Sequence, residues 1–128
     1  MTFVDSSVPY LPVKVKRAIF YVDCDTIKWF KTDGNYTTLY LSDNSSLVSR
    51  VSLKDLEDRL PPGQFVRIHK SFIVNHTYIS KRTATKITVD DTSLTIGRVH
   101  QKQVYTFFDR IGTHPKKPRF FSGKPSGE

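Results

Sequence analysis

The sequence predicts a mostly β domain (a minor α+β variant), built from antiparallel hairpins, with one short helix in mid-chain and another towards the C-terminal end. Three observations support this class. Eight to ten short segments rich in β-branched and aromatic residues follow one another at close spacing. Turn residues such as Asp33-Gly34 separate these segments. Helical spacing of apolar residues occurs at only two places, which disfavours a βαβ sheet.

The first half of the chain contains four expected strands, at residues 15–22, 27–30, 36–41 and 47–51. The segment 36–41 alternates, so Tyr36, Thr38 and Tyr40 should share one face and Thr37, Leu39 and Leu41 the other. We interpret Trp29, Phe30 and Tyr40 as core side chains rather than as platforms for stacked bases.

Two segments have the period of a helix. Ser52 is a suitable N-cap, with Asp55 three residues later, and Leu53, Leu56 and Leu60 follow at helical spacing. Pro61-Pro62-Gly63 should end this helix. The second helix is expected near the C-terminal end, with apolar residues at positions 104, 107, 108 and 111. Between them, residues 79–83, 86–89 and 93–96 are expected to form short strands.

The most informative stretch is residues 65–75. Residues 65–69 alternate like a half-buried strand, Lys70-Ser71 makes a polar break, and residues 72–74 form a second apolar run. The two strands would bracket a corner that carries a cation, a hydroxyl and the His69 imidazole side by side. Such a corner is suited to an anionic partner.

Length and charge define the expected organisation. A chain of 128 residues is enough for one domain, which we place at residues 14–111, between a flexible arm at 1–13 and a disordered basic tail at 112–128. The formal net charge of +8 favours an anionic partner, although more than half of this excess lies in the first 17 and last 20 residues. Thirteen N-terminal residues cannot form a receiver domain, so the chain is either a stand-alone regulator or a fragment.

Several other classes of protein are disfavoured. The single cysteine, Cys24, leaves no internal disulfide, and neither a membrane span nor a signal peptide is present, so we expect a cytoplasmic protein. The four histidines lack ligand spacing, so we expect no metal and no cofactor. His69 and Ser71 lie two residues apart, but no Gly-x-Ser-x-Gly elbow accompanies them, so we expect neither an enzyme nor a small-molecule substrate.

Five pieces, taken in order, resemble the LytTR (LytR/AlgR-type) DNA-binding domain. They are residues 27–30, 33–37, 52–56, 65–75 and 93–98. The resemblance implies an elongated stack of small antiparallel β-sheets with one or two short helices. It also implies a bacterial transcription regulator, often of a two-component system, that binds double-stranded DNA. Members of the family insert loops into the major groove of direct repeats, and two copies act together on the DNA.

The same resemblance assigns candidate site residues. Thr37, Lys70 and Arg98 match the positions that contact bases, with Tyr36 and Thr38 as alternatives to Thr37. A lysine at position 70, where some relatives have Asn or Arg, suits phosphate or guanine better than adenine. Residues that would contact phosphate or support the site are Asn35, Tyr36, Arg67, His69, Ser71 and Lys102. We expect Arg67 to pair with a carboxylate and shape the corner, and His69 and Ser71 to satisfy backbone groups or touch phosphate.

Two alternative functions remain open from the residues alone. A small β module that binds single-stranded nucleic acid would need aromatic side chains exposed on a strand face. An interaction module without a nucleic-acid role would use the basic tail to dock on an acidic protein or a membrane.

Overall fold

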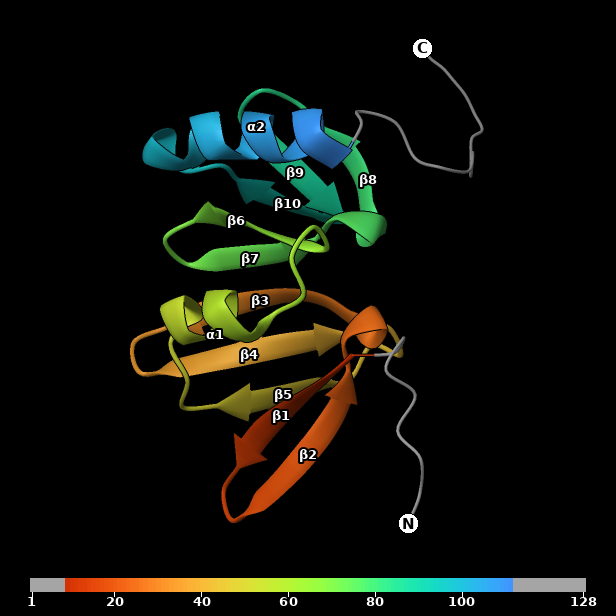
Figure 1. Ribbon diagram of the computed structural model, residues 1–128, viewed down its shortest axis with the longest axis vertical. Coiled ribbons are helices and arrows are strands. Elements are labelled where there is room, and N and C mark those ends of the chain that lie inside the picture. Colours follow the sequence, from red (N-terminus) through yellow and green to blue (C-terminus); the bar gives the residue numbers. More distant parts are fainter. Residues whose placement is uncertain (1–8, 112–128) are drawn as a thin grey trace.

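The computed structural model describes residues 9–111, in which ten strands form three antiparallel sheets stacked along the long axis of the molecule (Figure 1). The strands are β1 (Tyr10–Val15), β2 (Ala18–Asp23), β3 (Ile27–Asp33), β4 (Tyr36–Leu41), β5 (Ser46–Ser49), β6 (Phe65–His69), β7 (Phe72–Asn75), β8 (Ile79–Arg82), β9 (Lys86–Val89) and β10 (Thr92–Thr95). The helices are α1 (Leu53–Arg59) and α2 (Gln101–Ile111), with single 3-10 turns η1 (Cys24–Thr26), η2 (His76–Tyr78) and η3 (Arg98–His100).

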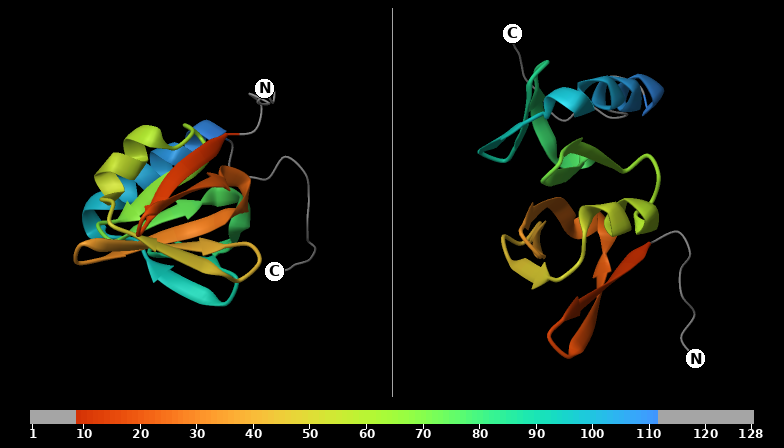
Figure 2. Two further views of the ribbon diagram at one scale, coloured as in Figure 1. Left: turned by 90° about the horizontal axis from the view of Figure 1, so that it is seen from below. Right: turned by 90° about the vertical axis from the view of Figure 1, so that its left-hand side faces the viewer.

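The middle layer is a five-stranded sheet with the order β5-β4-β3-β7-β6. The β1–β2 hairpin lies below it in Figure 1, and the three-stranded sheet β10-β9-β8 lies above it with α2. Figure 2 shows the same stack from below and from the side. These sheets, with two short helices, confirm the predicted fold class and the elongated stack.

Strand alternation divides the core into two apolar clusters. Phe30 and Ile73 point to the cluster that includes α1 and the β1–β2 hairpin, whereas their neighbours Trp29 and Val74 point to the cluster that includes α2 and β8–β10. Phe30 is fully buried, and the Trp29 and Tyr40 rings stack with centroids 4.3 Å apart. The three aromatic residues therefore serve the core, as predicted.

Both helices form where the sequence predicts them. The Ser52 hydroxyl accepts a hydrogen bond from the backbone N–H of Asp55 (3.0 Å), and Leu53 and Leu56 are buried beneath α1. In α2, Val104 and Phe108 face the core. No helix between residues 9 and 111 is long and apolar enough to cross a bilayer.

The N-terminal strand is where the predicted boundaries were wrong. The expected strand 15–22 is instead a hairpin, with Lys16-Arg17 at its turn, and residues 10–13 of the expected arm belong to β1. Leu11 and Val13 are almost fully buried, so burial at alternate positions stabilises a strand that contains Pro12. Residues 1–8 of the predicted arm and residues 112–128, the predicted tail, lie outside the described residues. Residue 9 directly precedes β1.

Candidate nucleic-acid interface

The turn between β6 and β7 is the predicted polar corner, and Arg67 holds it in place. The guanidinium donates from Nε to the His69 carbonyl (2.8 Å) and from Nη2 to the Lys70 carbonyl (2.7 Å). Its Nη1 atom pairs with Glu57 Oε2 on α1 at 3.1 Å, which confirms that Arg67 has a carboxylate partner. The Lys70 side chain itself is exposed. Arg67 therefore positions Lys70, and its own donors are used inside the protein.

Two further hydrogen bonds anchor the corner. The backbone N–H of Ser71 donates to His69 Nδ1 (3.0 Å), and the Ser71 carbonyl accepts from the backbone N–H of Thr32 on β3 (2.9 Å). His69 thus satisfies a backbone group, which is one of the two roles predicted for it. The turn is therefore bonded to β3 as well as to its own strands, and it presents Lys70 from this hydrogen-bonded base.

Arg98 lies beside this corner because Gly97 is bonded to it. The Gly97 N–H donates to the Ile68 carbonyl on β6 (2.7 Å). A Cβ atom at position 97 would lie 3.1 Å from His100 Nδ1, so the His100 ring would have to shift by a few tenths of an ångström, whereas its distance of 3.5 Å from the His69 Cα is an ordinary contact. Arg98 then begins η3 with an exposed side chain.

His100 is the last residue of η3, and its surroundings disfavour the charged imidazole. Burial lowers the pKa of His100 below its usual value, and electrostatic interactions with Arg67 and then with His69 lower it further. Its Nδ1 atom is buried without a hydrogen-bond partner among the described residues. The lowered pKa favours the neutral imidazole at the end of η3.

The β3–β4 turn supplies the third predicted loop, but not through Thr37. Thr37 has no exposed surface, and its hydroxyl donates to the Val51 carbonyl (2.6 Å). A side chain in this position cannot reach a base, so the assignment of Thr37 is corrected. Among the predicted site residues of this loop, Asn35, in the turn itself, and Tyr36, which is 52% exposed, face solvent.

A depression joins the β3–β4 turn to the β6–β7 turn. Its described lining is Thr32, Gly34, Asn35, Arg50, Val51, Ser52, Leu53, Lys54, Arg67 and Lys70. Four of these side chains are cations and none is acidic, and the Arg50 guanidinium lies 5.7 Å from the centre of the Tyr36 ring. Sequence reasoning missed Arg50 and Lys54, although they flank the recognised Ser52 cap on both sides. Their role could not be read locally, because the depression brings them close to Lys70 only in the folded chain.

The three predicted loops open on one side of the molecule. The β3–β4 turn, the β6–β7 turn and η3 follow one another along the left-hand side of Figure 1. A family model for the LytTr DNA-binding domain matches residues 17–109, which include all three loops. The chain belongs to the LytTR family.

Solved structures and curated proteins agree with this assignment. The LytTr DNA-binding domain of a putative methyl-accepting/DNA response regulator from Bacillus cereus superposes with a TM-score of 0.66 and 18% identity, over 78% of this chain and 96% of that chain. The heme-containing CO-sensing transcriptional regulator RcoM 2 of Paraburkholderia xenovorans is 40% identical over 68 residues, which is 53% of this chain and 25% of that protein. The sensory transduction protein LytT of Bacillus subtilis is 29% identical over 100 residues, or 73% of this chain and 41% of that protein.

This LytTR chain therefore spans between a quarter and about two fifths of the length of these curated relatives. Domains of the family are DNA-binding regulatory domains; RcoM 2 is a transcriptional regulator by name, and LytT is a sensory transduction protein. Among the residues that the structure describes, no cluster of His, Cys, Asp or Glu is arranged to hold a metal ion.

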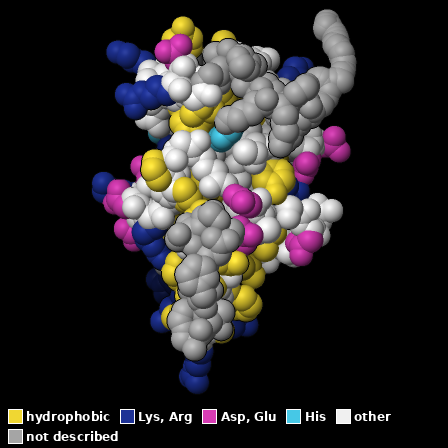
Figure 3. Space-filling model, turned by 45° about the vertical axis from the view of Figure 1, so that its right-hand side comes forward, with side chains coloured by type: hydrophobic (Ala, Val, Ile, Leu, Met, Phe, Trp, Pro, Cys, Tyr) yellow, Lys and Arg dark blue, Asp and Glu magenta, His cyan; other side chains and the backbone are white. Residues whose placement is uncertain are grey.

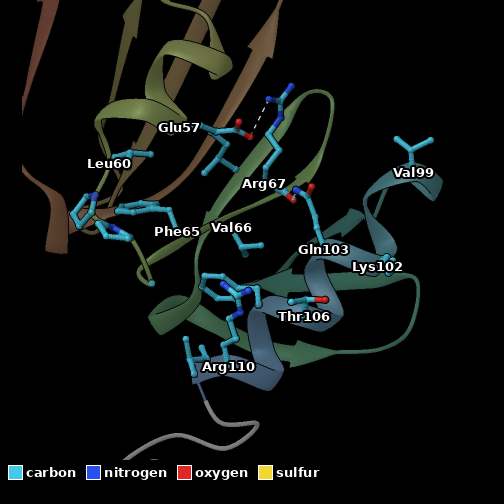
Figure 4. A pocket seen from close by; sticks show the side chains of 16 residues that line it. Glu57, Leu60, Phe65, Val66, Arg67, Val99, Lys102, Gln103, Thr106 and Arg110 are labelled. Atoms are coloured by element: carbon cyan, nitrogen blue, oxygen red, sulfur yellow. Dashed lines mark hydrogen bonds and ion pairs between the residues drawn. The ribbon is translucent and has the colours of Figure 1, made fainter.

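Lys102 lies apart from the depression, at the edge of a larger groove between α1, β6 and α2 (Figure 4). The groove has a floor that includes Phe65 and Val66, and Arg67 lines both the groove and the depression. The Gln103 side chain donates from Nε2 to the Arg67 carbonyl (2.8 Å), which fixes the start of α2 against β6. Lys102 is exposed next to this contact.

Proposed function

We propose that this LytTR domain binds double-stranded DNA sequence-specifically, as the DNA-reading part of a bacterial transcription regulator. The observation that carries the proposal is the common side on which three loops present Asn35, Lys70 and Arg98, with a cationic depression between the first two loops. Rigid presentation matters because base reading requires side chains to reach the groove without a large ordering cost.

Each exposed residue has a chemical role in this proposal. Arg98 has a free guanidinium and would donate to O6 and N7 of a guanine, a contact worth about 1–3 kcal/mol of discrimination. Lys70 is a point charge and would contact phosphate or guanine. Asn35 and Tyr36 take the place of Thr37 at the first loop, and Lys102 would hold a phosphate next to η3.

The remaining predicted residues act through others. Arg67, His69 and Ser71 make internal hydrogen bonds that hold the Lys70 turn, so their role in this proposal is to position Lys70 rather than to contact DNA. Two copies would bind direct repeats as a pair that forms on the DNA. Since the bacterial chromosome lies in the cytoplasm, the proposal places the protein there.

Selection from a random duplex library tests this function. Wild type should recover a short motif. Arg98→Ala should relax base preference at one position, and Lys70→Ala should weaken binding or relax a second position. Lys81→Ala is a matched control, because Lys81 is an exposed cation on β8, away from the three loops. Recovery of the wild-type motif with unchanged sharpness by both loop variants would contradict the assigned roles.

Two additional measurements separate this function from its alternatives. If about six phosphates are neutralised, log affinity should fall with log salt at a slope of about −5. A single-stranded oligonucleotide that competes as well as the selected duplex would favour the single-stranded module instead. Binding to a probe with two repeats, compared with one, reports whether a pair of copies assembles.

A further inference from the structure

We propose that the phosphate-binding surface continues from the Lys70 corner to the tip of the β1–β2 hairpin and holds the backbone of one DNA strand. This inference rests on the proposed function and adds a contact region to it. The track consists of six cations, Lys70, Lys54, Arg50, Lys14, Lys16 and Arg17, all with exposed side chains. Of these, only Lys70 belongs to the predicted reading loops.

Contacts in the structure make the track continuous. Lys70, Lys54 and Arg50 line one depression. Directly before Arg50, the Ser49 hydroxyl donates to the Lys14 carbonyl on β1 (2.6 Å), so the edge of the five-stranded sheet and the hairpin touch at this point. From Lys14, strand β1 ends at Val15 and leads into the Lys16-Arg17 turn.

These cations are not neutralised within the protein. The ion pairs in residues 9–111 are Lys28 with Asp90 and Arg67 with Glu57, and neither includes a residue of the track. Arg50 contacts the Tyr36 ring, which orients a guanidinium without removing its charge. On the hairpin, the acidic residue Asp23 lies opposite Tyr10 at the end far from the turn. None of the six cations forms an ion pair within residues 9–111, so each side chain is available to an external anion.

The backbone of the hairpin turn points in the same direction. Lys16 has a φ of +58°, and Gly34 has a φ of +64° at the same place in the two-residue β3–β4 turn. Glycine adopts this conformation freely, whereas a side chain with a Cβ does so at a cost. Lys16 makes no ion pair that offsets this cost among the described residues. An ionic contact between Lys16 and an external anion would offset the cost of this backbone conformation.

The overall shape fits a strand that runs along the molecule. The hairpin turn lies at the lower end in Figure 1, below the side that carries the three reading loops. In Figure 3, dark-blue side chains follow the lower left edge and end at the lowest point of the molecule. Flexible cationic side chains that follow one another along a surface can each contact a phosphate of the DNA backbone. Contacts of this kind do not distinguish one base from another.

Two double variants test the track. Lys16→Asn with Arg17→Gln removes the charge at the tip, and asparagine tolerates positive φ, so the turn should remain folded. Arg50→Gln with Lys54→Gln removes the charge in the depression. The matched control is Lys81→Gln with Lys86→Gln, which removes two exposed cations from β8 and β9. Urea unfolding of each variant verifies that the domain remains folded.

The readout is the salt dependence of duplex binding by the full chain. Each track variant should reduce the steepness of log affinity against log salt by about 1.8, since each phosphate contact contributes about 0.9. Affinity should fall equally for the selected motif and for random duplex, and the motif itself should not change. Hydroxyl-radical footprinting should show protection shortened at one end for the tip variant.

Each result has a distinct meaning. A tip variant that matches the control in slope and footprint overturns the hairpin contact, and a depression variant that does so overturns the rest of the track. Wild type that selects no duplex motif refutes the proposed function, and the track falls with it. Loss of binding to anionic vesicles or acidic peptide, with duplex binding intact, would assign the cations to another partner and overturn the inference.

Discussion

Arg67→Lys is a sharp test of how the corner is built, because it keeps the charge and removes the planar fork. Arg67 makes three interactions at once, to the carbonyls of His69 and Lys70 and to Glu57. A lysine ammonium at the end of an unbranched chain can satisfy one of the carbonyls but cannot span all three acceptors. The variant therefore loosens the turn without changing net charge.

The magnitude follows from the bonds that are lost. A hydrogen bond from a charged donor contributes about 1.5–3 kcal/mol, and the lower value applies at a turn that water can reach. The bond to Glu57 adds about 0.5 kcal/mol or less, because the Glu57 side chain is 41% exposed. We expect Arg67→Lys to lower the free energy of unfolding by about 2 kcal/mol, which at an m-value of about 2 kcal/mol/M shifts the urea midpoint by about 1 M.

The same change should weaken duplex binding about tenfold at an unchanged salt slope. DNA would have to restore the order of the Lys70 turn, and about 1.4 kcal/mol corresponds to a factor of ten in affinity. Fluorescence anisotropy with the selected duplex, at several salt concentrations, measures both quantities. The unchanged slope distinguishes loss of positioning from loss of a phosphate contact.

Two controls make the reasoning refutable. Arg59→Lys is the same chemical change on α1, where Arg59 makes one bond to the Pro12 carbonyl (3.1 Å), and it should alter stability by about 0.5 kcal/mol and leave DNA affinity unchanged. Glu57→Gln removes the ion pair but leaves both carbonyl bonds of Arg67. If Glu57→Gln were as damaging as Arg67→Lys, or if Arg67→Lys matched Arg59→Lys, the carbonyl bonds would not be what holds the turn.

Three further predictions, with four substitutions, follow from buried polar groups. Thr37→Val should lower the free energy of unfolding by about 1–2 kcal/mol in urea, because it leaves the Val51 carbonyl without its hydrogen-bond donor. The selected DNA motif should stay unchanged, and a loss of base preference would instead support Thr37 as a base-contacting residue. Asp90→Asn should lower the free energy of unfolding by about 2 kcal/mol, because it leaves the buried Lys28 ammonium without its carboxylate. Lys28→Met should cost less, because the exposed Asp90 carboxylate can hydrate once its partner is gone. Equal losses of stability in the two variants would contradict this difference. Burial, and then the neighbouring Asp23 and Asp25, raise the pKa of Cys24 to about 11. The free energy of unfolding should therefore fall as pH rises from about 8.5, where the thiol of the unfolded chain ionises, towards about 11. Cys24→Ala should show a smaller fall over the same pH interval.

Local signals in the sequence predicted the parts of the fold that local forces determine. The Ser52 cap, the Asp33-Gly34 turn and the alternation of residues 65–69 each depend on neighbours within four residues, and all three occur in the structure. Strand β1 was missed because burial of Leu11 depends on β2 and α1, which are distant in sequence, whereas the local prolines suggested an irregular segment.

The error at Thr37 has a different origin. Alternation in residues 36–41 placed Thr37 on the same face as Leu39, and the structure buries both. That pattern contained the correct answer, but the family resemblance assigned the position to a loop and outweighed it. Arg50 and Lys54 were missed for a third reason: the depression that they line exists only once three segments, from three parts of the chain, have packed together.

The distinction between reading and positioning residues depends on where each side chain finds its hydrogen-bond partners. Arg67, His69 and Thr37 are polar residues within the predicted loops, and each has its partner inside the domain. Lys70 and Arg98 lie on the same structure but have exposed side chains that form no ion pair among the described residues. A donor that is already bonded would have to break that bond before it reached DNA, whereas a free donor exchanges only water. The residue types in the loops therefore indicate DNA contact, and the internal hydrogen bonds decide which of these side chains are available to contact DNA.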